Sequence, residues 1–166
     1  MKLFRARAWR FGSTSFDPLD SSGSVSGPRG WRFNELSTEI LYTAEVEALA
    51  ILEVAVRPGF ESIQEVLVAT IEVPDGSLVD PVDLGITLPS NWNARPVADD
   101  SRSIAREFLD AVQALPGRAP RPFGLRVPSV LSSSDFNVLL DPSRRADYSA
   151  RMTGRVPFKV LRQTRS

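Results

Sequence analysis

The alternation of apolar and polar residues along the chain predicts a protein built mainly of β-strands. The clearest strand is expected over residues 65–73, which end at the turn-forming Pro74-Asp75-Gly76. Further strands are expected over residues 3–11, 40–43, 123–127, 136–140 and 156–161. Because strands dominate and helices do not alternate strictly with them, the pattern favours an α+β domain over a doubly wound sheet.

Two segments instead show helical periodicity. The first begins at Thr43 or Ala44 and ends before Pro58-Gly59, and the second covers residues 101–114 with Ser101 as a candidate N-cap. Between the predicted elements lie three segments rich in turn-forming residues, at 12–30, 77–100 and 116–122. A loop as long as the first of these is typically functional or disordered, so we expect it to border a binding cleft.

One residue interrupts the apolar pattern of the first predicted helix. Residues 48–56 are apolar at every position except Glu53, and a stretch that is hydrophobic on all sides is typical of a buried element. A buried carboxylate must be neutralised, paired or kept for a function, because an unpaired buried charge is very unfavourable. Glu53 is therefore the first candidate active-site residue. A purely structural alternative pairs it with Arg57, one helical turn further on.

The composition limits the chemistry that is available. The 166 residues fit one domain and include neither His nor Cys. This excludes Ser-His-Asp and Cys-His catalysis, disulfides and zinc sites of the Cys/His kind, and we expect no metal. Only two of the 20 basic residues are lysines. Arginine is therefore the cation available to clamp a phosphate or carboxylate, which its planar fork binds through two oxygens.

Charge and hydropathy limit the setting and the partners. The 20 basic and 20 acidic residues give a net charge of zero, which argues against bulk electrostatic binding to nucleic acid or to an anionic membrane. No apolar stretch approaches the roughly 20 residues of a membrane span, and the N-terminal residues lack the apolar centre of a signal peptide. We therefore expect a cytoplasmic protein.

Several short motifs follow one another in a recognisable order. They are Trp9-Arg10, Gly30-Trp31-Arg32-Phe33-Asn34, Tyr42-Thr43-Ala44-Glu45 running into Ala48-Leu49-Ala50-Ile51-Leu52-Glu53, Leu125-Arg126-Val127-Pro128-Ser129, and Asn137-Val138-Leu139-Leu140-Asp141-Pro142. Together they resemble the RES domain, a family named for its Arg, Glu and Ser. The likeness spans about residues 9–160 of a single predicted domain covering residues 1–166. Each motif alone is weak, but their shared order is fairly specific.

The resemblance implies a fold, an activity and a partner. RES proteins resemble ADP-ribosyltransferases, with a split, mostly antiparallel β core and flanking helices around an NAD cleft. They are typically bacterial toxins that degrade NAD, by phosphorolysis in characterised members. NAD is then a substrate rather than a cofactor, and inorganic phosphate is a candidate co-substrate. The implied partner is an antitoxin with an Xre-like helix-turn-helix domain, which blocks the cleft in a toxin–antitoxin hetero-oligomer. This chain itself is not expected to bind nucleic acid or a membrane.

The resemblance also assigns roles to residues. Arg32, Glu53 and Ser129 fall on the three family letters and are the implied catalytic set, and Arg10, Arg32 and Tyr42 fall on positions near the NAD pocket. Cleavage of the nicotinamide–ribose bond develops positive charge on the ribose, which a fixed carboxylate such as that of Glu53 stabilises. Nicotinamide leaves as a neutral ring, so the lack of His is no obstacle.

Two alternatives to NAD degradation stay open at this point. The first is an ADP-ribosyltransferase that modifies a protein, and the second is a catalytically idle binding module. The chain also departs from the family pattern. Phe33 replaces the usual Trp, Val46-Glu47 replaces a common Ser-Pro pair, and residues 92–122 are more Pro-rich than the usual stretch. The last departure, in residues 92–122, falls in the predicted wall of the pocket and therefore affects how the substrate fits.

Overall fold

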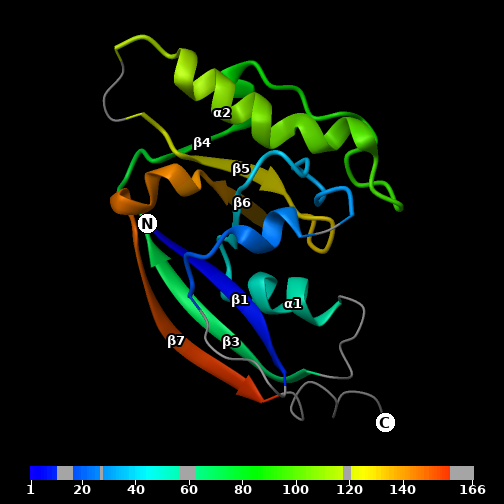
Figure 1. Cartoon of the computed structure of the whole chain (residues 1–166), viewed down its shortest axis with the longest axis vertical. Coiled ribbons are helices and arrows are strands. Elements are labelled where there is room, and N and C mark those ends of the chain that lie inside the picture. The colour runs from blue at the N-terminus through cyan, green and yellow to red at the C-terminus, as the bar shows by residue number, and fades with distance from the viewer. Residues whose placement is uncertain (11–16, 27, 57–62, 118–120, 158–166) are drawn as a thin grey trace.

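The computed structural model describes residues 1–10, 17–26, 28–56, 63–117 and 121–157, apart from the side chains of Trp9 and Arg10 (Figure 1). One seven-stranded sheet runs through the molecule in the order β4-β5-β6-β2-β1-β3-β7. Its strands are β1 (Lys2–Arg10), β2 (Leu41–Ala44), β3 (Ile63–Glu72), β4 (Leu78–Val79), β5 (Gly124–Pro128), β6 (Phe136–Leu140) and β7 (Ser149–Pro157). Only β4 and β5 pair in parallel, so the predicted α+β fold with a mostly antiparallel sheet is confirmed.

The sheet is nearly divided between β1 and β2. These strands share one paired position, Phe4 with Ala44, whereas β1 pairs with β3 along its whole length and β2 pairs with β6 at every residue. The sheet therefore consists of two well-paired parts, β4-β5-β6-β2 and β1-β3-β7, which diverge beyond a single junction. In Figure 1 these parts form the upper and lower halves of the molecule.

Two helices cover the two parts of the sheet. Helix α2 (Ile104–Ala114) lies along the β4–β5 side, and α1 (Glu47–Ala55) lies beside β1 and β3 (Figure 1). The apolar face of α2 buries Ile104, Ala105 and Phe108 in a core with residues of β5 and β6. Helix α1 buries Leu49, Ala50 and Val54 against the apolar residues of β1 and β3. Short 3-10 helices form at Ser22–Val25, Pro81–Leu84, Asp99–Ser103 and Pro142–Asp147.

The start of each α-helix differs from the prediction. Thr43 and Ala44 belong to β2, because pairing with β6 keeps them extended, and α1 begins at Glu47. Helix α2 begins at Ile104, after a 3-10 turn. The hydroxyl of Ser101 is not the cap of α2, since it donates to the carbonyl oxygens of Ala98 and Arg32. In both cases a long-range contact overrides a local signal.

Two strands also differ from the prediction. β7 covers Ser149–Pro157 instead of residues 156–161, and the predicted part beyond Pro157 lies outside the described residues. The side chains of β7 are mostly exposed, because β7 is an edge strand. Its sequence therefore lacks the alternation of apolar and polar residues that predicts a strand. β4 forms within the predicted loop 77–100, and its two residues are too few to show a period.

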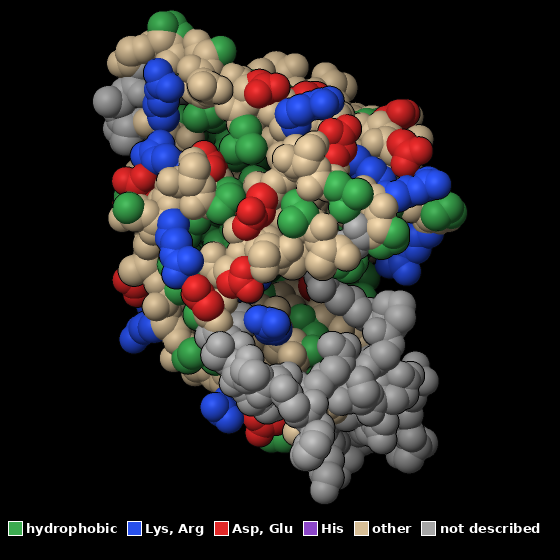
Figure 2. All heavy atoms as spheres, viewed as in Figure 1, with side chains coloured by type: hydrophobic (Ala, Val, Ile, Leu, Met, Phe, Trp, Pro, Cys, Tyr) green, Lys and Arg blue, Asp and Glu red, His purple; other side chains and the backbone are tan. Residues whose placement is uncertain are grey.

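The surface of the molecule carries charges of both signs. Figure 2 shows acidic and basic side chains interspersed over the face in view. Within the part of the chain that the structure describes, no helix has the length and hydrophobicity that crossing a membrane requires.

Candidate functional site

A cavity of about 590 Å³ opens where the two parts of the sheet diverge. Its walls come from β1, β2, α1, the segment before β2, the segment before α2, and the connection between β5 and β6. Three of the predicted site residues, Arg32, Tyr42 and Glu53, line it. The described part of the long first loop contributes Asp20–Ser24 and Ser26 to the lining, so the prediction that this loop borders the cleft is confirmed for those residues.

Glu53 is held by two neutral donors. The Asn137 side-chain amide donates to Glu53 Oε1 at 2.9 Å, and the Ser129 hydroxyl donates to the same oxygen at 3.3 Å. The Ser129 oxygen also accepts from the backbone N–H of Leu131, which fixes the hydroxyl. Within the described residues, both hydrogen bonds of Glu53 end on Oε1, so none of these residues occupies Oε2, which can accept from a ligand.

The helix that carries Glu53 is less buried than the sequence predicts. Leu52 is 40% exposed and Val56 is 51% exposed, and Glu53 is half-buried. The apolar run reflects a helix that buries one face, with Leu49, Ala50 and Val54, against the sheet and leaves Leu52 and Val56 exposed. The carboxylate therefore faces a cavity and does not need the neutralisation that full burial would demand. The alternative pairing with Arg57 lies outside the described residues.

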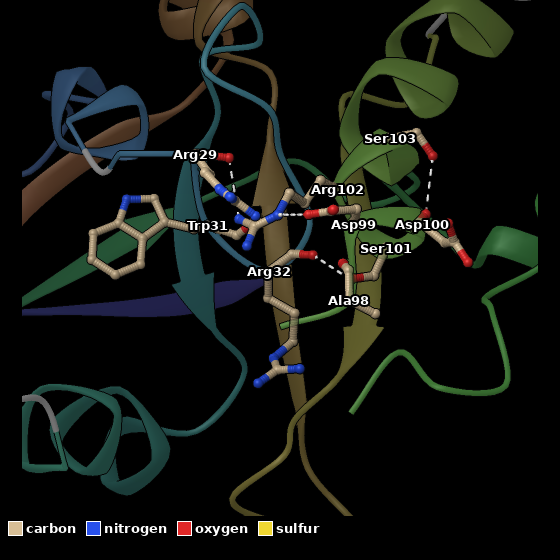
Figure 3. Close-up of polar contacts among 9 residues, drawn as sticks. All are labelled: Arg29, Trp31, Arg32, Ala98, Asp99, Asp100, Ser101, Arg102 and Ser103. Carbon is tan, nitrogen blue, oxygen red and sulfur yellow. Dashed lines mark hydrogen bonds and ion pairs between the residues drawn. The ribbon is translucent and has the colours of Figure 1, made fainter. Parts of the chain in front are cut away.

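Arg32 lies in the same cavity and is also held by neutral groups. Its Nη1 donates to the carbonyl oxygens of Trp92 at 2.7 Å and Ala94 at 3.1 Å. Burial lowers the pKa of the Arg32 guanidinium, the nearby charge of Arg95 lowers it further, and the Glu53 carboxylate opposes both effects. In Figure 3 the side chain of Arg32 extends away from the polar cluster around its own backbone.

The turn that presents Arg32 depends on Gly30, Asn34 and Tyr42. Gly30 has a φ of 78°, and a Cβ built there would lie 2.2 Å from the Asn34 carbonyl oxygen, so no other residue fits. The Tyr42 hydroxyl donates to Asn34 Oδ1 at 2.9 Å and accepts from the Phe33 N–H at 3.2 Å. The hydroxyl of Tyr42 therefore braces the turn, while its ring lines the cavity.

The remaining predicted residues have different outcomes. Ser129 does not line the cavity itself, but it is buried and touches Glu53 directly. The side chain of Arg10 lies outside the described part of the chain, so its assignment to NAD stays a prediction. The structure therefore brings Arg32, Tyr42, Glu53 and Ser129 to one place from four separate segments.

A second group of charges lies outside the cavity lining. Arg126 on β5 binds Glu45 through two nitrogens, at 2.7 and 3.3 Å, and Asp80 at 3.1 Å. We call these three residues the Arg126 ion cluster. The guanidinium also lies over the Phe136 ring, 4.2 Å from its centre. The hydrogen bond that Arg126 donates to Glu45 raises the pKa of Arg126, whereas the pKa of Arg32 is lowered.

Comparison with known proteins now places the chain. The profile of the RES domain matches residues 2–159. The chain belongs to the RES domain family. The "Prs ADP-ribosylating toxin" of Sphingobium sp. is 31% identical over 140 residues, which cover 81% of each chain. Two proteins named "Toxin Res" are 29% identical: one from Photorhabdus laumondii over 127 residues (75% of each chain) and one from Yersinia enterocolitica over 120 residues (70% of this chain and 71% of the relative).

Sequence reasoning missed several cavity residues of this RES domain. Asn137, which bonds Glu53, was readable only as part of a strand motif. One signal could have found Asn137. It is a polar residue on β6 that pairs with the apolar Ala44 of β2 and the apolar Val127 of β5. Arg95 lies in a Pro-rich stretch without periodicity, and Arg5 and Arg7 were read as ordinary strand residues.

Proposed function

We propose that this RES domain is a toxin that cleaves the nicotinamide–ribose bond of NAD and passes the ADP-ribosyl group to phosphate or water. The observation that carries the proposal is the state of Glu53, an ionisable carboxylate that lines a cavity and is held through one oxygen by Ser129 and Asn137. The similarity of the chain to proteins named as toxins supports the proposed role as a toxin. The split, mostly antiparallel sheet supports the ADP-ribosyltransferase-like architecture that the family resemblance implies.

The proposed reaction needs a fixed negative charge more than it needs an acid. As the C1′–N bond breaks, both electrons move to the pyridinium nitrogen, and nicotinamide leaves as a neutral molecule. Positive charge develops on the ribose, and the Glu53 carboxylate stabilises it, directly or through a ribose hydroxyl that donates to Oε2. The acceptor oxygen then bonds to C1′, and water as acceptor releases a proton. Because Ser129 and Asn137 fix Oε1, the carboxylate is oriented before the substrate arrives.

The cations of the cavity suit the two phosphates of NAD. Arg32 and Arg95 both line the cavity, and after burial the repulsion from the charge of Arg95 is the next cause that lowers the pKa of Arg32. An anion between them relieves that repulsion. Arg32 uses Nη1 for the carbonyl oxygens of Trp92 and Ala94, which leaves its other nitrogens to donate to phosphate oxygens. The ring of Tyr42 offers an apolar surface in the same cavity.

A second candidate function shares the first step. The Sphingobium relative is named as an ADP-ribosylating toxin of Prs, which favours transfer of ADP-ribose from NAD to a protein side chain. Both functions require Glu53 and release nicotinamide. They differ only in the acceptor, so the distinction is whether nicotinamide appears without a protein target.

The proposed toxin acts with an antitoxin that carries an Xre-like helix-turn-helix domain, as the family resemblance implies. A chain that consumes NAD harms its own cell unless an inhibitor covers the cavity. The interspersed charges in Figure 2 fit a shape-matched protein partner better than a polyelectrolyte. Expression of this chain alone is expected to deplete cellular NAD, and coexpression with an adjacent helix-turn-helix protein is expected to prevent the loss.

The deciding experiment incubates the purified protein with NAD, with and without inorganic phosphate, and follows the products by chromatography. Release of nicotinamide with ADP-ribose 1-phosphate indicates phosphorolysis, and release with free ADP-ribose indicates hydrolysis. The Glu53→Gln variant, which is expected to lose NAD turnover, serves as the negative control. If NAD stays intact under both conditions but disappears when a cell extract is added, with label from NAD transferred to protein, the second function replaces the first.

A further inference from the structure

We propose that Arg102, which lies outside the cavity lining, is a positioning residue that holds Arg32 in place. It acts through the backbone of the turn that carries Arg32. The structural part of this proposal stands alone, and its effect on catalysis rests on the function proposed above. Neither the motifs nor the family letters point to Arg102, because it lies in the Pro-rich part of the chain that departs from the family pattern.

Arg102 contacts the turn through one charged nitrogen. Its Nη1 donates to the carbonyl oxygens of Arg29 at 3.1 Å and Trp31 at 3.0 Å. The side chain is 14% exposed, and Figure 3 shows its guanidinium between these two residues. Hydrogen bonds from a charged donor are roughly twice as strong as those between neutral groups. Arg102 therefore fixes the backbone on both sides of Gly30, where the chain has its left-handed residue.

The neighbours of Arg102 hold the next two carbonyl groups. The buried Ser101 hydroxyl donates to the carbonyl oxygen of Arg32 at 2.8 Å, and the Ala105 N–H donates to that of Phe33 at 2.8 Å. Consecutive carbonyl groups from Trp31 to Phe33 are thus all bound by the short stretch between Ser101 and Ala105. The turn has no regular secondary structure of its own, so these bonds take the place of strand pairing.

The same segment of the chain also holds the other end of Arg32. The guanidinium donates to the carbonyl oxygens of Trp92 and Ala94, a few residues before Arg102. Both the backbone and the side-chain tip of Arg32 are therefore positioned by residues 92–102. A binding group must be held within about 0.5 Å of its productive position to be effective, and a loop arginine does not reach that accuracy alone.

A simple surface ion pair does not explain Arg102. Its Nε lies 3.3 Å from Asp99 Oδ1, but the Asp99 side chain is 75% exposed, and exposed pairs contribute little. Arg102 instead makes two charged hydrogen bonds, to the carbonyl groups of Arg29 and Trp31. Arg102 does not line the cavity, so the turn is its contact route to the site, and its charge also acts on Arg32 through space.

The test compares Arg102→Ala and Arg102→Lys with a matched control, Arg106→Ala. Arg106 also joins α2 to the segment after Arg32, through Glu35 at 3.4 Å, but that pair is exposed and touches no carbonyl of the turn. Hydrogen exchange is read at the N–H groups of Trp31 and Phe33, which are bonded to Asn34 and Tyr42 in the intact turn. We expect Arg102→Ala to speed their exchange about tenfold or more, Arg102→Lys to restore most of the protection, and Arg106→Ala to match the unchanged protein. Equal exchange in Arg102→Ala and Arg106→Ala overturns the proposal.

The catalytic part is tested by combining Arg102→Ala with Arg32→Lys. If Arg102 acts through Arg32, Arg102→Ala lowers kcat/KM about tenfold in the unchanged protein and less than threefold in the Arg32→Lys background. Equal losses in the two backgrounds contradict a role through Arg32. A protein that turns over no NAD refutes the proposed function, while the exchange measurement still decides whether Arg102 holds the turn.

Discussion

The cavity and the Arg126 ion cluster hold their charges in opposite ways. In the cluster, Arg126 meets the carboxylates of Glu45 and Asp80 directly. In the cavity, Arg32 is held by neutral carbonyl groups and Glu53 by a hydroxyl and an amide. Within the described chain, no carboxylate forms an ion pair with Arg32, and no cation forms one with Glu53. The pKa directions of the two arginines follow this difference, raised for Arg126 and lowered for Arg32.

We interpret this difference as one between charges that join segments of the fold and charges that are kept for a ligand. A charge that meets its counter-charge inside the protein is already satisfied and joins segments of the fold. A charge that is oriented by neutral groups keeps its full attraction for a ligand, and the protein accepts a cost in stability to keep it. We therefore expect substitutions in the cavity to lower activity and substitutions in the cluster to lower stability.

The largest expected contrast is between Glu53→Gln and Glu45→Gln. Both exchange a carboxylate for an amide of the same shape. Glu53→Gln removes the charge that stabilises the developing positive charge on ribose, so NAD turnover should fall on the order of 100-fold or more with little change in Tm. Glu45→Gln should keep turnover within about threefold, because Glu45 lies outside the cavity lining. Turnover assays and thermal unfolding of both variants check the contrast, which fails if Glu53→Gln unfolds or turns over NAD normally.

Arg32→Lys is the next largest effect. Lysine keeps the charge but lacks the fork that can bond two carbonyl groups and a phosphate together. We expect kcat/KM to fall about tenfold, mainly through a higher KM for NAD. Steady-state kinetics measure kcat and KM of Arg32→Lys. Titration of NAD binding, with and without Arg32→Lys in the Glu53→Gln background, measures the change in affinity. Unchanged NAD affinity in the Lys variant would show that Arg32 does not bind phosphate.

Arg126→Gln should act on stability. The substitution leaves Glu45, whose side chain is 18% exposed, without its charged partner. We expect a loss of about 1–2 kcal/mol in the free energy of unfolding, reduced from the value of a fully buried pair because Arg126 and Asp80 are partly solvated. Denaturant unfolding gives the number, with the exposed Arg155–Glu65 pair as the matched control, where Arg155→Gln should change stability by less than about 0.5 kcal/mol.

A binding anion should also distinguish Arg32 from Arg126. Inorganic pyrophosphate, placed between Arg32 and Arg95, removes their mutual repulsion. At several times its dissociation constant it should raise Tm by about 2–4 °C. The rise should persist in Arg126→Gln and vanish in Arg32→Gln. A similar rise in both variants would mean that the anion binds elsewhere.

The smallest expected effect concerns the loop beside the cavity. Residues 20–24 line the cavity, so NAD bound to the inactive Glu53→Gln variant should slow their hydrogen exchange by about twofold to fivefold. Exchange in β5 around Arg126 should stay constant. If hydrogen exchange in residues 20–24 were the same with and without NAD, the loop would not contact the bound NAD.

Much of the fold followed from the sequence because the relevant signals are local. The continuous apolar run around Val66 to Ile71 indicates β3, and the helical period of the apolar face indicates α2. The features that the sequence did not predict depend on contacts between residues far apart along the chain. Glu45 was read as a residue of the first helical turn, but β2 pairs with β6 and places it before α1, where it meets Arg126. β7 pairs with β3 through its backbone and needs no apolar pattern.

The sequence named candidate residues that the structure brings together, but it did not predict their geometry. Arg32, Glu53 and Ser129 came from the family resemblance, and an isolated carboxylate in an apolar run marked Glu53 independently. That same run wrongly indicated full burial, because apolar residues facing a cleft look like those of a core. Asn137 and Arg102 were missed, since each acts on a residue more than 60 positions away.

The order of these residues along the chain bears on how the protein is made. Glu53 cannot acquire its amide partner until Asn137 has been synthesised, and β2 has no strand on its β6 side until Leu140 emerges. A ribosome that stops anywhere in the first three-quarters of the message therefore releases a fragment with an incomplete site. The part of the sheet that contains β2 is thus completed only by strands made late, so the proposed site is assembled near the end of synthesis.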